Sequence, residues 1–160
     1  MNVSNTELDD DVADLLRKAD QRYTTGRRKL VKALQAGAGP LTITQILATD
    51  TSLPQSTVYR NLTILEEVGA VARIATTEDF ARYELAEHLT EHHHHIICSS
   101  CGDVTDFSLD SSVERTLDTA LQKEARKAGF AVDGHRLDLL GTCANCSYCL
   151  LYTSPSPRDS

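Results

Sequence analysis

The sequence predicts an α+β protein made of two parts. Along the first half of the chain, apolar residues recur at helical spacing and the segments end at glycines, which indicates several short helices. In the second half, short extended segments accompany two Cys-x-x-Cys pairs, Cys98/Cys101 and Cys143/Cys146. Two such pairs, brought together by folding, supply the four thiolates that Zn²⁺ binds in tetrahedral geometry. We therefore expect a helical domain followed by a small α/β domain that contains a four-cysteine zinc site.

With 160 residues, of which 41% are hydrophobic and 24% charged, the chain has the composition of a small soluble protein with one or two compact domains. No apolar run approaches the roughly 20 residues that span a bilayer, and the acidic start lacks the basic and apolar regions of a signal peptide. We expect a cytoplasmic protein that has no membrane partner. Because thiols stay reduced in the cytoplasm, the cysteine pairs favour metal binding over disulfides.

The net charge of −7 would usually count against nucleic-acid binding, since phosphate contacts need Lys and Arg. The charge is unevenly distributed, however, because seven basic residues and a single acid, Asp20, lie between Arg17 and Lys32. This basic strip is able to contact DNA, but it also fits a solvated helix face. Taken alone, the strip leaves both interpretations open.

Four helices are expected in the first half of the chain. Apolar residues define one face of each helix, and residues with known preferences for helix ends mark the boundaries, with Thr or Pro near the starts and Gly near the ends. The expected helices run from Leu8 to about Ala19, from after Thr25 to Gly37, from Thr42 to the turn at Asp50, and from Pro54 to Gly69.

The third and fourth of these helices are short and are joined by a tight turn, which suggests a helix-turn-helix. In that motif the second helix enters the major groove of DNA, and its N-terminal half contacts the bases. Two extended segments, 70–75 and 80–85, follow with a polar turn between them and are expected to form the wing of a winged helix. The side chains of the fourth helix that are able to contact DNA are Gln55, Ser56, Thr57, Tyr59, Arg60 and Asn61.

The second half is expected to contain three strands and one helix after a polar hinge at 86–91. The helix carries an apolar face formed by Val113, Leu117, Leu121 and Ala125. The expected elements are strands at 94–98 and 104–108, a helix capped by Ser111 or Ser112 and ended by Gly129, and a final strand from about Ala131 to Leu140.

A run of four histidines, His92 to His95, comes immediately before the first cysteine pair. Successive side chains of a strand point to opposite faces, so one strand is able to supply two separate metal sites. The alternatives are a solvated polar stretch or an affinity tag, and a tag is disfavoured because the run is internal, short and followed directly by an apolar segment. His92 and His94 face one way, His93 and His95 the other, and further ligands are expected from Glu84, Asp106, Glu114 and His135.

Three motifs resemble the Fur (ferric uptake regulator) family of metal-dependent bacterial repressors over about residues 8 to 146. The resemblance implies a winged-helix DNA-binding domain at 1–85, a hinge at 86–91 and an α/β dimerisation domain at 92–146. It also implies a homodimer that binds palindromic double-stranded DNA operators when its regulatory metal is loaded. The motifs are STVYRNLTILEEVG at 56–69, HHHHIICSSCGDVTDF at 92–107 and HRLDLLGTCANC at 135–146.

Position by position, the resemblance implies three metal sites and a surface that contacts DNA. The cysteines at 98, 101, 143 and 146 match structural zinc ligands. The set His93, His95, Glu84 and Asp106 matches a regulatory site, and the set His92, His94, Glu114 and His135 matches a further site. Tyr59 and Arg60 match the recognition helix, and Arg22 and Arg27 match basic positions that approach DNA.

The resemblance implies that the regulatory metal is Zn²⁺, Fe²⁺ or Mn²⁺, with zinc slightly favoured. Many iron, manganese and peroxide sensors of the family carry a His just before the third helix, whereas this chain has Pro40 near that place. The histidine run resembles the zinc-responsive branch, although the hinge lacks the Cys of that branch and His88 is the candidate substitute. Asp106 instead resembles the peroxide sensors.

Two other classes of function fit the sequence less well. A zinc deaminase needs His-x-Glu with Pro-Cys-x-x-Cys, and a zinc protease needs His-Glu-x-x-His, and neither pattern occurs in the chain. We therefore expect no enzyme. A zinc-stapled protein-interaction module without DNA binding is the alternative. The segment 147–160, which contains Cys149, is expected to be disordered or non-native.

Overall fold

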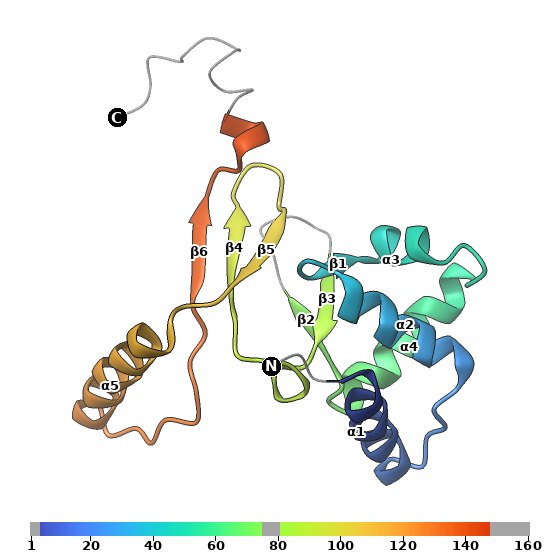
Figure 1. The fold of residues 1–160 in the computed structure, drawn as a ribbon, viewed down its shortest axis with the longest axis horizontal. Coiled ribbons are helices and arrows are strands. Elements are labelled where there is room, and N and C mark those ends of the chain that lie inside the picture. The colour runs from blue at the N-terminus through green and yellow to red at the C-terminus, as the bar shows by residue number, and fades with distance from the viewer. Residues whose placement is uncertain (1–3, 75–80, 148–160) are drawn as a thin grey trace.

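The computed structural model describes residues 4–74 and 81–147 and confirms the α+β fold (Figure 1). The expected turn of the wing, and all but the first residue of the expected tail, lie outside the described residues. No helix in the part described is both long enough and apolar enough to cross a membrane. The elements are α1 (Asn5–Lys18), α2 (Thr25–Ala36), β1 (Leu41–Thr42), α3 (Ile43–Thr49), α4 (Gln55–Glu67), β2 (Val71–Ile74), β3 (Arg82–Leu85), the 3₁₀ turn η1 (Glu87–Leu89), β4 (His94–Cys98), β5 (Val104–Phe107), α5 (Ser111–Lys127) and β6 (Asp138–Gly141).

Helices α1 to α4 pack around one apolar core. A capping box starts α1, because the Ser4 hydroxyl accepts the N–H of Glu7 and the Glu7 carboxylate accepts the N–H of Ser4. The helix therefore begins at Asn5, earlier than predicted. Thr42 caps α3 as predicted. The core side chains with less than 2% exposure include Leu16, Leu30, Ile46, Leu62 and Leu65.

The first sheet completes the helical half and has the strand order β1-β3-β2. Strands β2 and β3 pair antiparallel, with Val71 opposite Leu85 and Ile74 opposite Arg82. This pairing is the one expected for the wing. Side chains of the central strand β3 contact both halves of the molecule, since Tyr83 and Leu85 join the apolar core of the helical half whereas Glu84 contacts His93 and His95.

The second sheet has the order β5-β4-β6, with β4 antiparallel to β5 and parallel to β6. Its register places His95 opposite Asp106 on one side and Asp138 on the other, and Cys98 opposite Gly141. Directly opposed residues of neighbouring strands project from the same face of a sheet. The register thus gathers His95 and two carboxylates on one face.

Two predicted boundaries in the second half are wrong. Helix α5 begins after Asp110, which makes no side-chain cap hydrogen bond, so neither predicted serine is the cap. The final strand covers only Asp138–Gly141 instead of 131–140. Asp133 and Gly134 are poor strand formers, and this stretch carries His135 toward α5 instead of extending the pairing with β4.

Helix α5 lies at one end of the molecule, apart from the helical half (Figure 1). It contains no buried residue. On its predicted apolar face, Val113 is 49% exposed and Leu121 is 39% exposed, and Phe130 and Leu140 nearby in the sequence are 70% and 69% exposed. In the single chain, this apolar surface is uncovered.

The two halves touch through the loop before β1 and through β3. A Cβ atom added at Gly39 would lie only 2.8 Å from the carbonyl oxygen of Val104, so only glycine permits this approach. The Arg82 guanidinium lies 3.4 Å from the Asp103 carboxylate and donates to the carbonyl of Pro40. Both contacts hold the helical half against the start of β5.

Candidate metal centres and nucleic-acid interface

Two turns bring the four described cysteines together at one end of the second sheet. Cys98 ends β4, and Cys101 follows in a turn that continues through Gly102, whose φ of 76° suits glycine. The parallel pairing of β4 with β6 places Cys143 and Cys146 beside them. The Sγ atoms of Cys101 and Cys143 are 3.8 Å apart, and all four Sγ atoms lie within 4.8 Å of one another. We call these four residues the cysteine cluster.

Hydrogen bonds to sulfur make the pKa values of these thiols unequal. The backbone N–H groups of Cys143 and Cys101 lower the pKa of Cys98 to about 6. Neighbouring thiols, that of Cys143 first, raise the pKa of Cys146. Crowded thiols resist joint ionisation, whereas a bound divalent ion deprotonates its thiol ligands. Four free thiols at this spacing are therefore a donor set that fits Zn²⁺.

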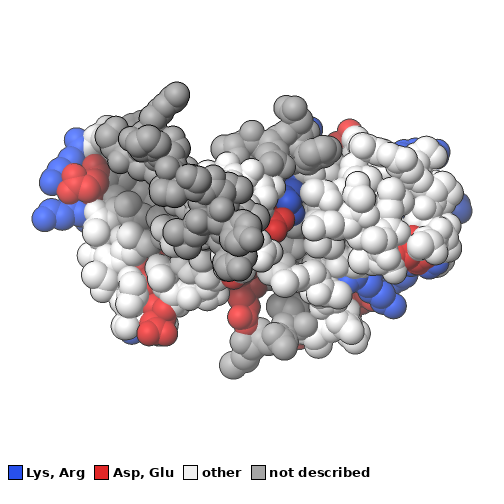
Figure 2. Space-filling model, turned by 90° about the horizontal axis from the view of Figure 1, so that it is seen from above, with Lys and Arg blue, Asp and Glu red and all other residues white. Residues whose placement is uncertain are grey.

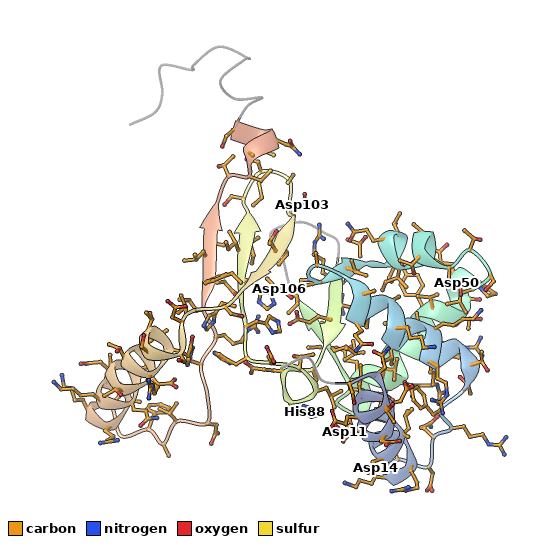
Figure 3. The ribbon with its side chains drawn as sticks, viewed as in Figure 1. Asp11, Asp14, Asp50, His88, Asp103 and Asp106 are labelled. Atoms are coloured by element: carbon orange, nitrogen blue, oxygen red, sulfur yellow. The ribbon has the colours of Figure 1, made fainter. Side chains whose placement is uncertain are left out.

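A second cluster joins the two halves of the molecule. The Oε2 atom of Glu84 lies 3.1 Å from Nε2 of His93 and 3.0 Å from Nε2 of His95. The Oδ1 atom of Asp106 lies 3.5 Å from Nε2 of His95, and Figure 3 shows Asp106 between the two sheets. A cavity of about 160 Å³ opens onto Glu84 and both histidines. We call Glu84, His93, His95 and Asp106 the bridging cluster, because Glu84 belongs to β3 and the others to the second half.

The charges of the bridging cluster are incompletely satisfied. Burial raises the pKa of Asp106, whose Oδ1 atom is buried without a hydrogen-bond partner among the described residues. The hydrogen bond with Glu84 raises the pKa of His95. Burial opposes ionisation of Glu84, yet the two imidazoles hold its pKa below the usual value. Two imidazoles and two carboxylates that converge around an orphaned oxygen fit a divalent cation.

A third cluster forms against α5, and we call it the helix cluster. Its members are His92, His94, Glu114 and His135. One carboxylate serves all three rings, since Glu114 lies 3.0 Å from Nε2 of His92, 2.9 Å from Nε2 of His94 and 2.8 Å from Nε2 of His135. The Nε2 atom of His135 is buried and lacks hydrogen-bond geometry to any described residue, despite its short distance to Glu114. The set also fits a divalent cation.

The histidine run feeds these two clusters alternately. His93 and His95 lie in the bridging cluster, whereas His92 and His94 lie in the helix cluster. The alternation expected for a strand thus begins at His92, two residues before the start of β4 at His94.

Helix α4 presents an exposed polar face beside its buried apolar one. Ser56 and Arg60 are exposed, Thr57 is half-buried, and Tyr59 is 49% exposed, whereas Val58 is buried in the core. Figure 2 shows Lys and Arg at both ends of the long axis, including the end formed by the helical half. Such a face is able to contact phosphates and base edges.

Residues 18–140 match the ferric uptake regulator family. The chain belongs to this family. The resemblance inferred from the three motifs is therefore confirmed, and the family consists of regulators, in agreement with the expectation that the protein is no enzyme.

Relatives and solved structures of the family span almost the whole chain. The chain is 31% identical to the ferric uptake regulation protein of Campylobacter jejuni over 92% of this chain and 95% of the relative. It is 29% identical to the peroxide-responsive repressor PerR of Staphylococcus epidermidis, over 88% and 90%. The structure of the ferric uptake regulator Fur of Helicobacter pylori matches with a TM-score of 0.69 at 23% identity, covering 91% of this chain and 95% of that one. This last likeness shows the shared fold.

Two of the residues expected at the DNA surface of this Fur family member are buried. Arg27 is 8% exposed and Asn61 is 9% exposed. The Arg27 guanidinium donates to the side-chain oxygen of Asn61 at 3.2 Å, to the carbonyl of Arg22 and to Gln21. The prediction that Arg27 and Asn61 face DNA is wrong here, because both brace α4 against α2. Arg22 itself is exposed.

The hinge histidine does not join the regulatory set. His88 is exposed in η1 and is absent from the three clusters found in the described part of the chain. Figure 3 shows it well away from Asp106. The idea that His88 replaces a missing hinge ligand is therefore wrong. The role of Arg82 in joining the two halves was not predicted from the sequence, because its contact with Asp103 depends on how the halves pack.

Proposed function

We propose that this Fur family protein is a cytoplasmic metal-responsive repressor that binds palindromic operators as a dimer when its regulatory metal is bound. The observation that carries the proposal is the bridging cluster. Its ligands come from β3 of a DNA-binding domain (1–85) and, beyond a hinge (86–91), from a dimerisation domain (92–146). The relatives named above, a ferric uptake regulation protein and a peroxide-responsive repressor, support a regulatory role.

The bridging cluster suits a conformational switch. A metal bound by Glu84 on one side and by His93, His95 and Asp106 on the other favours the closed arrangement of the two domains over all others. In that arrangement the α4 helices of a dimer meet successive major grooves. A tenfold effect of metal on DNA affinity requires a coupling free energy of about 1.4 kcal/mol.

Zinc is the regulatory metal that the donor set favours over iron and manganese. Two imidazoles and two carboxylates make four protein ligands, the number that Zn²⁺ takes in closed tetrahedral sites. The loop before β1 adds no fifth donor at position 39, since a side chain there would meet the Val104 carbonyl. We assign a structural Zn²⁺ to the cysteine cluster and a further divalent ion to the helix cluster.

The dimer is supported by the uncovered surface of the second half. The large apolar side chains of Val113, Leu121, Phe130 and Leu140 are all between 39% and 70% exposed in the single chain. Exposed apolar side chains of this size are typical of protein–protein interaction sites when they gather on one face. A second copy of the chain that packs there would bury them and fix the spacing of two recognition helices.

The test is operator binding by the full-length protein with zinc in its cysteine cluster. Fragments of genomic DNA from the source organism are presented with Zn²⁺, Mn²⁺ or anaerobic Fe²⁺ in separate reactions. We expect specific retention with Zn²⁺. The double variant His93→Ala with His95→Ala should lose the metal-stimulated retention and remain a folded dimer, and His88→Ala is the matched control. Full stimulation in the double variant would contradict the assignment, and no retention with any metal would favour a zinc-stapled interaction module.

A further inference from the structure

The five histidines of the bridging and helix clusters share one orientation. Each Nε2 atom lies 2.8–3.1 Å from a carboxylate oxygen of its own cluster. The Nδ1 atoms point outward, and four of the five meet an oxygen outside the cluster, whereas that of His94 has no hydrogen-bond partner among the described residues. The outer oxygens belong to Glu87 for His92, the Glu91 carbonyl for His93, Asp138 for His95 and Asp118 for His135.

Asp118 holds the ring of His135 from the side opposite the helix cluster. Its Oδ1 atom lies 2.9 Å from Nδ1 of His135, while Glu114 lies at Nε2. Glu114 and Asp118 are four residues apart on α5, so they project from the same face of the helix. His135 itself comes from an irregular segment that has no strand pairing of its own. Two successive turns of α5 therefore fix the orientation of this imidazole.

Asp138 occupies the equivalent place beside His95 in the bridging cluster. The strand register sets His95 between Asp106 on β5 and Asp138 on β6. Accordingly, Nε2 of His95 faces Asp106, and Nδ1 lies 3.5 Å from Oδ1 of Asp138. The register of the sheet thus places a carboxylate beside Nδ1 of His95, as α5 places one beside Nδ1 of His135.

We propose that Asp118 and Asp138 are positioning residues that set the metal affinity of the helix cluster and the bridging cluster. An imidazole that binds a metal through Nε2 carries its proton on Nδ1. A carboxylate that accepts this N–H selects the tautomer, fixes the ring plane and raises the basicity of Nε2. The inference rests on the proposed metal sites, and it adds two residues that do not touch the metal.

A role in fold stability alone is a weak explanation for these contacts. The Asp118 side chain is 49% exposed and the Asp138 side chain is 34% exposed. Ion pairs with this much solvent access add little to folding. Removing either carboxylate should consequently leave the metal-free protein folded, which makes the variants usable.

The experiment measures Zn²⁺ affinity against a competing chelator in the full-length protein whose cysteine cluster is already loaded. A Glu84→Gln background disables the bridging cluster, so that the helix cluster is titrated alone, and a Glu114→Gln background does the reverse. We expect Asp118→Ala to weaken the helix cluster about tenfold to a hundredfold, and Asp138→Ala to weaken the bridging cluster similarly. Neither should change the other cluster.

Two further variants separate positioning from structure. Asp118→Asn keeps an oxygen that accepts the N–H but loses the charge, so its affinity should lie between those of wild type and Asp118→Ala. Glu124→Gln removes a carboxylate of α5 whose ion-pair partner among the described residues is Lys127, so this variant should not change the zinc affinity of either cluster. Ring-nitrogen NMR of the zinc-loaded wild type should show the proton of His135 on Nδ1, with a loss of this signature in Asp118→Ala.

The possible failures are distinct. Tight wild-type binding with equal affinity in Asp118→Ala and Asp138→Ala overturns the positioning role and leaves the proposed function intact. A wild-type protein that takes up no Zn²⁺ beyond its cysteine cluster overturns the proposed metal switch, and the positioning role with it.

Discussion

The cysteine cluster and the bridging cluster each bring together four possible metal ligands, but they draw these ligands from different parts of the molecule. All four cysteines belong to residues 98–146 and gather at the end of one sheet, whereas the bridging cluster takes Glu84 from the other half of the molecule. A cross-link within one domain stabilises its fold, while a cross-link between two domains selects their arrangement. Under the proposed function, the location of the ligands relative to residues 86–91 decides whether a bound metal stabilises one domain, as a staple, or selects the arrangement of two domains, as a switch.

The largest effect is expected from breaking the staple. Structural zinc sites contribute roughly 10–16 kcal/mol of apparent binding free energy, as much as the whole stability of a small domain. Cys98→Ser should therefore unfold the second half or dissociate the dimer, as seen by circular dichroism and sedimentation. Cys149→Ser, outside both cysteine pairs, is the matched control. A stable dimer with normal zinc content in Cys98→Ser would refute the four-thiolate site.

Breaking the switch should abolish regulation without unfolding. Glu84→Gln keeps the size of the side chain but removes the only bridging ligand on β3 among the described residues. We expect a loss of tenfold or more in metal-stimulated operator affinity, with unchanged thermal unfolding of the metal-free protein. Glu114→Gln, whose cluster lies within the second half, should reduce the stimulation less. Equal losses in fluorescence anisotropy would remove the distinction between the two clusters.

Lowering the pH should release metal from the bridging cluster before it releases zinc from the cysteine cluster. Hydrogen bonding to Glu84 raises the pKa of His95, and the Glu91 carbonyl and Glu84 raise that of His93 against the effect of burial. In the metal-free protein, the ion pairs of these rings stabilise the closed form below the pKa of an unfolded His and are lost as pH rises through the raised values. Metal must displace the same protons, so its affinity should fall by up to about tenfold per proton for each pH unit of acidification. The cysteine cluster must also release thiol protons, but a structural zinc site starts from an apparent binding free energy of roughly 10–16 kcal/mol at about pH 7. Equilibrium dialysis from about pH 8 to about pH 6 should therefore empty the bridging cluster before the cysteine cluster.

The smallest effect is expected at the direct contact between the halves. Asp103→Ala removes the carboxylate partner of Arg82, but the Asp103 side chain is 65% exposed. Exposed pairs are worth about 0–1 kcal/mol, so metal-stimulated DNA affinity should fall by no more than about fivefold. A loss as large as that of Glu84→Gln would mean that this ion pair, and not the metal, closes the molecule.

Much of this architecture could be predicted from local patterns in the sequence. The spacing of the cysteine pairs and the alternation of His92 to His95 each depend on one turn or one strand, and all three predicted ligand sets converge in the structure. The capping residue Thr42 is equally local.

The missed features all depend on packing between elements. Arg27 looked like a DNA contact because its position in α2 is basic, and only the approach of α4 shows that Asn61 receives its guanidinium. Asp118 and Asp138 were passed over because nothing nearby in the sequence identifies their partners. The sequence shows that Asp118 lies four residues after Glu114. Only the structure shows that the segment carrying His135 runs past α5 and places this imidazole against Asp118.

The parallel pairing of β4 with β6 has a consequence for synthesis of the protein. Parallel strands need a long crossover, and here α5 and the segment after it separate Cys98 from its neighbour Gly141. During translation the first thiol pair leaves the ribosome well before the second, and it holds only half of a tetrahedral site until the last strand emerges. Closure of the cysteine cluster thus comes late, and a nascent chain that stops short of Asp138 would have neither the edge strand β6 nor the second cysteine pair that completes the zinc site.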